Sequence, residues 1–173
     1  FLEGFIKYSS GGDTFSVKVD DQQQLQKFKE QAENIRPDAK ASAITMQNLE
    51  QLKNSGCLHV PGPGLALEAQ QRAIVGHSEW SLCGITHTTS SARAMDLITE
   101  CVTEPLQEWD ALICTSLAVK QNVEFLLQSR VDYLKERLGI TKIIMPQLPV
   151  IPLGINTQQF TFTAKERSSA RNK

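Results

Sequence analysis

The sequence predicts an α/β fold, with a mostly parallel sheet that carries helices on both of its faces. Short apolar runs typical of buried strands alternate with longer segments whose apolar residues recur at helical spacing. This alternation is typical of βαβ units, which place parallel strands in one sheet. Hydrophobic residues make up 40% of the 173 residues, which is enough for a single domain with its own core.

The first segments are expected to form a helix, a strand and a second helix. Residues 1–8 have the apolar spacing of an amphipathic helix, and a turn rich in serine and glycine follows them. Apolar and polar residues alternate over 14–19, as in a half-buried strand. The next helix is capped by Asp20 or Asp21 and stops at Pro37, because proline cannot continue a helix.

Three strands and two helices are expected to follow in alternation. Residues 41–44 predict a short strand, and residues 46–53 predict a short helix. The run over 57–60 predicts the next strand, and the apolar spacing over 65–75 predicts the next helix. Residues 82–86 form a compact apolar run, which is typical of a strand buried in a parallel sheet.

The remaining elements continue the pattern. Residues 90–103 have helical spacing, and residues 111–114 form another apolar strand-like run. A long helix then begins at a cap provided by Thr115 or Ser116 and ends at Gly139.

A last strand is expected over residues 148–151, before a turn-rich exit. We expect residues 1–160 to form one domain and residues 161–173 to be a linker. The chain begins at Phe1 inside a helical pattern and ends at Lys173 in a polar run, so we expect it to be a piece of a longer protein.

The composition excludes several classes of function. A net charge of −1 gives no overall electrostatic attraction for nucleic acid. No apolar run approaches the length of a membrane span, and no secretory signal is present. The four cysteines lack the close spacing of zinc or redox motifs, so we interpret them as reduced core thiols of a cytoplasmic protein. They are Cys57, Cys83, Cys101 and Cys114.

His87 ends the strand over 82–86 and is followed at once by Thr88, Thr89 and Ser90. Parallel α/β sheets bind ligands at the carboxyl ends of their strands, and a helix N-terminus there favours anionic oxygens. This pattern therefore predicts a site for phosphates or sugar hydroxyls. The alternative is that His87 is a core histidine bonded to a backbone carbonyl, and that the hydroxyls only cap the helix.

Gly62 and Gly64 lie in a Pro-Gly-Pro-Gly loop after the preceding strand, which a parallel sheet places beside His87. Glycines there permit close approach of a ligand to the backbone, although a plain tight turn is the favoured explanation of them. His59 is expected to pack within a strand, and His77 to lie in an exposed loop. The histidines lack ligand-like spacing, so we expect no metal site and no cofactor.

Three segments together resemble family 4 (group 1) glycosyltransferases. Residues 84–90 resemble the strand-end histidine segment of that family, and residues 109–119 resemble its "D-x-(I/V)-x-x-x-S" strand before a long helix. Residues 150–160 resemble its "V-I-P-x-G-[IV]-D-x-x-x-F" hinge, with Asn156 at the position of the usual aspartate. The order and spacing agree over most of the chain after Cys57.

The resemblance implies the N-terminal, acceptor-side domain of a GT-B enzyme, in which two Rossmann-like domains face each other across a cleft. It places a first strand with a glycine-rich loop before Phe1 and a nucleotide-sugar-binding domain after Lys173. It also implies a retaining transfer from a nucleotide-sugar donor to a hydroxyl acceptor, which is a glycan, a lipid or a small molecule. The chain alone is then expected to be inactive.

The family pattern gives His87 the catalytic position. Thr88, Thr89, Ser90, Gly62 and Gly64 become the candidate substrate-binding residues, without metal or cofactor. The expected location is the cytoplasm, with attachment to a membrane surface left open. Two alternatives remain: a sugar-nucleotide epimerase of the same fold, and a catalytically silent domain that recognises sugars or nucleotides.

Overall fold

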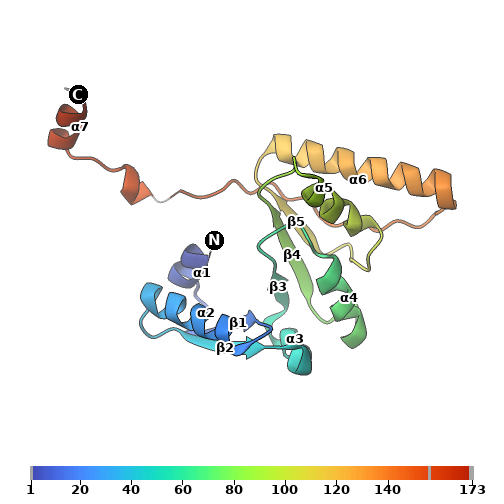
Figure 1. The fold of residues 1–173 in the computed structure, drawn as a ribbon, viewed down its shortest axis with the longest axis horizontal. Coiled ribbons are helices and arrows are strands. Elements are labelled where there is room, and N and C mark those ends of the chain that lie inside the picture. The colour runs from blue at the N-terminus through green and yellow to red at the C-terminus, as the bar shows by residue number, and fades with distance from the viewer. Residues whose placement is uncertain (1, 156, 172–173) are drawn as a thin grey trace.

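The computed structural model describes residues 2–155 and 157–171, and it contains two parallel sheets flanked by helices (Figure 1). The smaller sheet pairs β1 (Thr14–Lys18) with β2 (Lys40–Ile44). The larger sheet has the order β3-β4-β5, formed by Cys57–His59, Ser81–Thr86 and Ala111–Cys114. All of these pairings are parallel, so the predicted α/β class with parallel strands is confirmed.

Helices occupy the connections between the strands, as the alternating pattern predicts. The α-helices are α1 (Leu2–Tyr8), α2 (Gln22–Ile35), α3 (Leu52–Ser55), α4 (Ala66–Val75), α5 (Ala92–Thr99), α6 (Leu117–Leu138) and α7 (Ala164–Arg171). Three 3₁₀ segments are η1 (Met46–Gln51), η2 (Glu100–Val102) and η3 (Thr157–Phe160). The short helix expected over residues 46–53 is therefore mostly a 3₁₀ helix.

Side-chain caps fix where the main helices begin. Asp21, Ser91 and Ser116 each accept a hydrogen bond from the backbone N–H three residues further on, at 2.8, 3.2 and 3.2 Å respectively. The helix expected over 90–103 is shorter than predicted, because Ser91 caps it and the chain tightens into η2 after Thr99. Gly139 ends α6 with a φ of 65°, a left-handed conformation that glycine adopts without strain.

The strand expected over residues 148–151 is an irregular edge segment that runs parallel to β5. The Leu112 N–H donates to the Gln147 carbonyl at 2.8 Å, and the Ile151 N–H donates to the Cys114 carbonyl at 3.0 Å. Parallel bridges form at Gln147 and Val150 only. Prolines at 146, 149 and 152 lack the N–H that a regular ladder needs, which explains the interruption.

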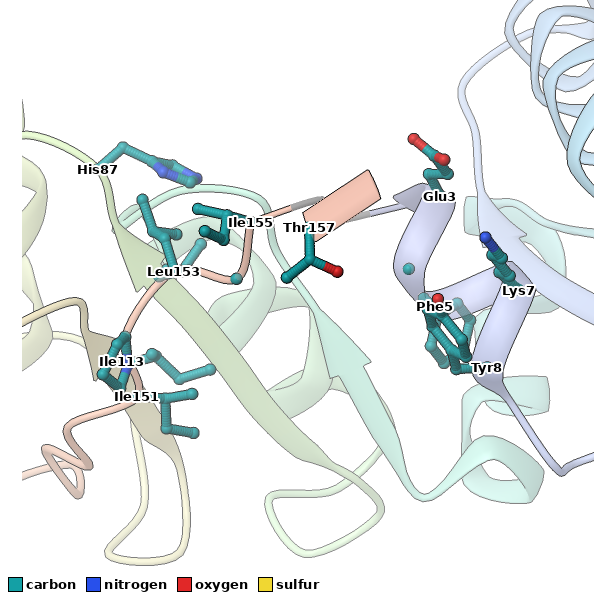
Figure 2. A pocket seen from close by; sticks show the side chains of 14 residues that line it. Glu3, Phe5, Lys7, Tyr8, His87, Ile113, Ile151, Leu153, Ile155 and Thr157 are labelled. Atoms are coloured by element: carbon teal, nitrogen blue, oxygen red, sulfur yellow. The ribbon is translucent and has the colours of Figure 1, made fainter. Parts of the chain in front are cut away.

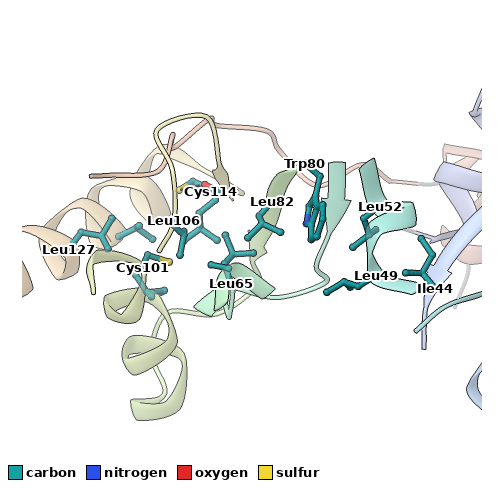
Figure 3. Packing of buried hydrophobic residues seen from close by; sticks show 14 residues of the cluster. Ile44, Leu49, Leu52, Leu65, Trp80, Leu82, Cys101, Leu106, Cys114 and Leu127 are labelled. Carbon is teal, nitrogen blue, oxygen red and sulfur yellow. Dashed lines mark hydrogen bonds between the residues drawn. The ribbon is translucent and has the colours of Figure 1, made fainter. Parts of the chain in front are cut away.

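The main core lies on one face of the larger sheet. Side chains from α4, α5 and α6 pack there against alternate residues of β4 and β5 (Figure 3). The fully buried members include Leu65, Leu82, Ile98, Leu112, Cys114, Val123 and Leu127. The opposite face carries Ile85 and Ile113, which belong to neither hydrophobic cluster of the described residues. Helices on both faces were expected, but here the second face borders an open cleft instead.

The smaller sheet has its own cluster, and Ile44 and Lys18 are among the residues that join it to the larger sheet. Ile6, Phe15, Ala32 and Ala39 bring α1, β1 and α2 together. Ile44 at the end of β2 belongs to the main core instead. The Lys18 ammonium on β1 lies 2.8 Å from the Glu68 carboxylate on α4, and both side chains are mostly buried.

The cysteines divide into buried and accessible thiols, all of them free. Cys101 and Cys114 are buried, and burial raises the pKa of the Cys101 thiol to about 12. Cys83 is half-buried. Cys57 is exposed because it starts the edge strand β3, so the interpretation of all four as core thiols is wrong at this position.

Arg72 and Asp110 form a fully buried ion pair at the amino ends of β4 and β5. The two guanidinium Nη atoms donate to the two carboxylate oxygens at 2.7 and 2.6 Å, a bidentate geometry. Asp110 also accepts from the backbone N–H groups of Leu82 and Gln107, at 2.8 and 2.7 Å. Arg72 donates in turn to the Trp80 carbonyl at 2.8 Å.

We predict that Asp110→Ala destabilises the domain by about 3–5 kcal/mol, because it leaves the Arg72 charge buried without a counter-ion. Glu124→Ala is the matched control, since Glu124 pairs with Lys120 on the surface of α6. An exposed pair of that kind contributes less than about 1 kcal/mol. Urea unfolding measures both losses in free energy.

Asp110→Asn retains an acceptor oxygen and removes the charge, so its loss should be intermediate. It serves as the test if Asp110→Ala does not fold. Equal stability of the Asp110→Asn and Glu124→Ala proteins would show that the buried pair is not structurally important.

Candidate functional site

A cleft of about 670 Å³ opens at the carboxyl ends of β4 and β5 (Figure 2). One wall is α1, another is formed by the ends of the two strands, and the third is formed by residues 151–155 and Thr157. Its lining residues are Glu3, Gly4, Phe5, Lys7, Tyr8, Ile85, His87, Ile113, Ile151, Pro152, Leu153, Gly154, Ile155 and Thr157.

His87 lies at the rim of this cleft, directly after β4, and its side chain is exposed. The strand end is fixed beneath it, because the fully buried Thr86 hydroxyl donates to the Ile113 carbonyl of β5 at 3.0 Å. Figure 2 shows the imidazole above Leu153 and Ile155, on the side of the cleft opposite α1. The alternative of a buried core histidine is therefore wrong for His87.

Thr88, Thr89 and Ser90 follow His87 but do not line the cleft. The Thr88 and Ser90 hydroxyl oxygens lie 3.2 Å apart, within hydrogen-bond distance of each other. The expectation that one of these three hydroxyls caps α5 is wrong, because Ser91 accepts the capping hydrogen bond. Their proposed contact with a substrate stays a prediction.

The glycine loop lies beside β4, as predicted, and packs closely there. The Gly62 carbonyl accepts a hydrogen bond from the Ile85 N–H at 3.0 Å. A Cβ atom on Gly84 would lie only 2.8 Å from the Gly62 oxygen, and a Cβ on Gly64 would lie 3.0 Å from the Leu97 side chain. Close packing thus accounts for Gly64 and Gly84, whereas a Cβ on Gly62 would meet no atom within 4 Å. Neither Gly62 nor Gly64 lines the cleft, and their binding role stays a prediction.

The electrostatics of the site are set by few groups. The ionisable side chains among the described lining residues are those of Glu3, Lys7, Tyr8 and His87. His59 on β3 is half-buried, and burial lowers its pKa, with a smaller contribution from the positive charge that His87 can carry. The expectation that His59 is packed agrees with this burial.

Two walls of the cleft were not expected from the sequence. Phe5 and Tyr8 on α1 were assigned only to an amphipathic helix, and the segment 151–157 only to a hinge. Ile151, Leu153 and Ile155 alternate with other residues, a pattern that could have indicated one apolar side along an extended segment.

Within the described residues, no group of histidine, cysteine, aspartate and glutamate side chains is placed to hold a metal ion. In the same part of the chain, every helix is too short or too polar to span a bilayer. The fold thus defines an α/β domain with parallel strands and a cleft at their carboxyl ends. Comparisons with protein-family models, curated proteins and solved structures found no match to this chain.

We predict that His59 makes the domain less stable at acidic pH. Because its pKa is lowered from 6.5 in the folded state, the unfolded chain binds the proton first as the pH falls. The His59 contribution is therefore complete above about pH 6.5 and decreases below it. Urea unfolding of wild type and His59→Gln at about pH 7.5 and 5.5 should show a smaller loss for the variant.

His77→Gln provides the matched control, since His77 is exposed in the loop between α4 and β4. It should lose as much stability as wild type between the two pH values. An identical loss in the His59→Gln protein would rule out His59 as the source of the pH dependence.

Proposed function

We propose that this chain is the acceptor-side domain of a retaining glycosyltransferase that uses a nucleotide-sugar donor. The observation that carries the proposal is the position of His87, exposed at the carboxyl end of β4 and on the rim of the cleft. Residues 151–155 and Thr157, which belong to the sequence that resembles the interdomain hinge of family 4 glycosyltransferases, line the same cleft.

In the proposed reaction, the bond between the anomeric carbon and the diphosphate oxygen breaks, and the bonding electron pair leaves with the diphosphate. An acceptor hydroxyl attacks the sugar from the same face and passes its proton to the departing diphosphate oxygen, so the anomeric configuration is retained. Positive charge develops on the sugar in the transition state. The imidazole of His87 holds the sugar by hydrogen bonding, and preorganised polar groups of this kind stabilise developing charge.

A separate nucleotide-sugar-binding domain is part of this proposal, since the resemblance places the donor site beyond the hinge. The cleft contains one lysine and no arginine for a diphosphate. We therefore expect this chain to bind a nucleotide sugar weakly and to be inactive alone. Both expectations agree with a role limited to the acceptor side.

We predict that His87→Ala in the full-length enzyme reduces kcat roughly 100- to 1,000-fold, the usual effect of removing one charge-stabilising group. His77→Ala is the matched control, because His77 is equally exposed but lies near the amino end of β4. Turnover is measured by release of the nucleoside diphosphate from uridine and guanosine diphosphate sugars. The thermal unfolding midpoint should be unchanged in both variants.

Wild-type turnover by the His87→Ala enzyme would show that His87 has no catalytic role. Binding of the donor by the full-length protein without any transfer would instead favour a silent recognition domain. Interconversion of the donor into an epimer would favour the related epimerase.

A further inference from the structure

We propose that the His87 cleft binds an acceptor with an apolar body and a single hydroxyl-bearing polar end, rather than a free sugar. The proposal rests on the glycosyltransferase assignment for its chemistry, and it adds the class of acceptor. The polar end lies at the rim beside His87, and the apolar body lies over the floor of the cleft.

The floor of the cleft is a continuous set of aliphatic side chains. Ile85 and Ile113 project from the second face of the larger sheet, where Ile85 is buried and Ile113 is half-buried. Leu153 and Ile155 lie alongside and are 59% and 71% exposed. Apolar side chains grouped in this way at a concave site indicate a surface that binds an apolar partner.

The far wall, α1, presents two aromatic rings beside Glu3 and Lys7, and one of the rings is packed from behind. Phe5 and Tyr8 of α1 line the cleft opposite His87 (Figure 2). The Phe5 ring packs edge-on against the buried Phe15 ring, with 5.7 Å between centroids. A wall anchored in this way is preorganised, so it loses little conformational freedom when a ligand packs against it.

Polar side chains lie on α1, at His87 and at Thr157, whereas the lining residues of β4, β5 and 151–155 carry none. Side chains that can hydrogen-bond are confined to Glu3, Lys7, Tyr8, His87 and Thr157. Each sugar hydroxyl taken from water needs a replacement partner, because an unbonded buried hydroxyl costs free energy. The aliphatic floor offers none, whereas an alkyl or aromatic group gains from the same burial. The volume of about 670 Å³ accommodates a molecule of that kind.

The probe is hexyl β-D-glucoside, compared with methyl β-D-glucoside, which has the same polar end and almost no apolar body. Both are titrated into the 173-residue chain and followed by backbone amide NMR shifts, below the concentration at which micelles form. Each methylene that becomes buried strengthens binding about fourfold. Since the cleft is open on one side, we expect the hexyl compound to bind at least about tenfold more tightly.

Leu153→Asp should remove this preference, because a carboxylate on the floor repels the alkyl chain. Ile74→Asp is the matched control, since Ile74 is similarly exposed but lies on the outer surface of α4. Equal binding of the two glucosides would overturn the proposal. Retention of the hexyl preference by Leu153→Asp would also overturn it, because the alkyl chain would then bind elsewhere.

A second arm identifies the source of the acceptor. Phosphatidylcholine vesicles with and without dodecyl β-D-glucoside are floated with the chain. Recruitment only by the doped vesicles supports an acceptor held in a membrane, and binding of the monomeric hexyl compound alone supports a free amphiphile. Recruitment to undoped vesicles at the same level would contradict recognition of a hydroxyl-bearing end.

These results are separate from the test of sugar transfer. If the hexyl preference depends on Leu153 but the full-length protein transfers no sugar, the proposed class of ligand is supported and the proposed glycosyl transfer is contradicted. If the full-length protein transfers sugar to free glucose and the hexyl preference is absent, the reaction holds and the acceptor class fails.

Discussion

The buried ion pair between Arg72 and Asp110 is the contact on which the larger sheet depends. It joins α4 to the chain that enters β5, and Asp110 accepts the Leu82 N–H of β4 as well. Two charges without exposure to water require hydrogen-bond partners. The bidentate geometry and the additional backbone bonds supply them to every polar atom of the pair except the Arg72 Nε, which has none. The pair therefore fixes the relative positions of one helix and two strands at the amino ends of the sheet.

With the amino ends fixed, the carboxyl ends of the same strands are free to form a site. The core lies on the face covered by α4, α5 and α6, while the buried Ile85 and the half-buried Ile113 on the other face border the cleft. His87 comes directly after the last residue of β4, so the register between β4 and β5 sets its position. Stability and the proposed chemistry thus occupy opposite ends of the same two strands, β4 and β5.

The sequence alone was sufficient to locate the strands and helices, because their signals come from residues close together in the chain. Strand and helix periods located β1 to β5 within a few residues, and cap residues such as Ser116 located the start of α6. The Arg72–Asp110 pair was not predicted, because its members are 38 positions apart and each looks like an ordinary polar residue. The walls of the cleft were missed for the same reason, since α1 and the segment 151–157 meet only through the tertiary fold.

The most direct test of the account is a crystal structure of the full-length protein with an intact nucleotide sugar. We predict that a nitrogen of the His87 imidazole lies within about 3.2 Å of a hydroxyl oxygen of the donor sugar. The hydroxyl-bearing part of the acceptor site would then face that sugar across the cleft. A sugar bound at the amino ends of the strands, beside the half-exposed Trp109, would contradict the central claim.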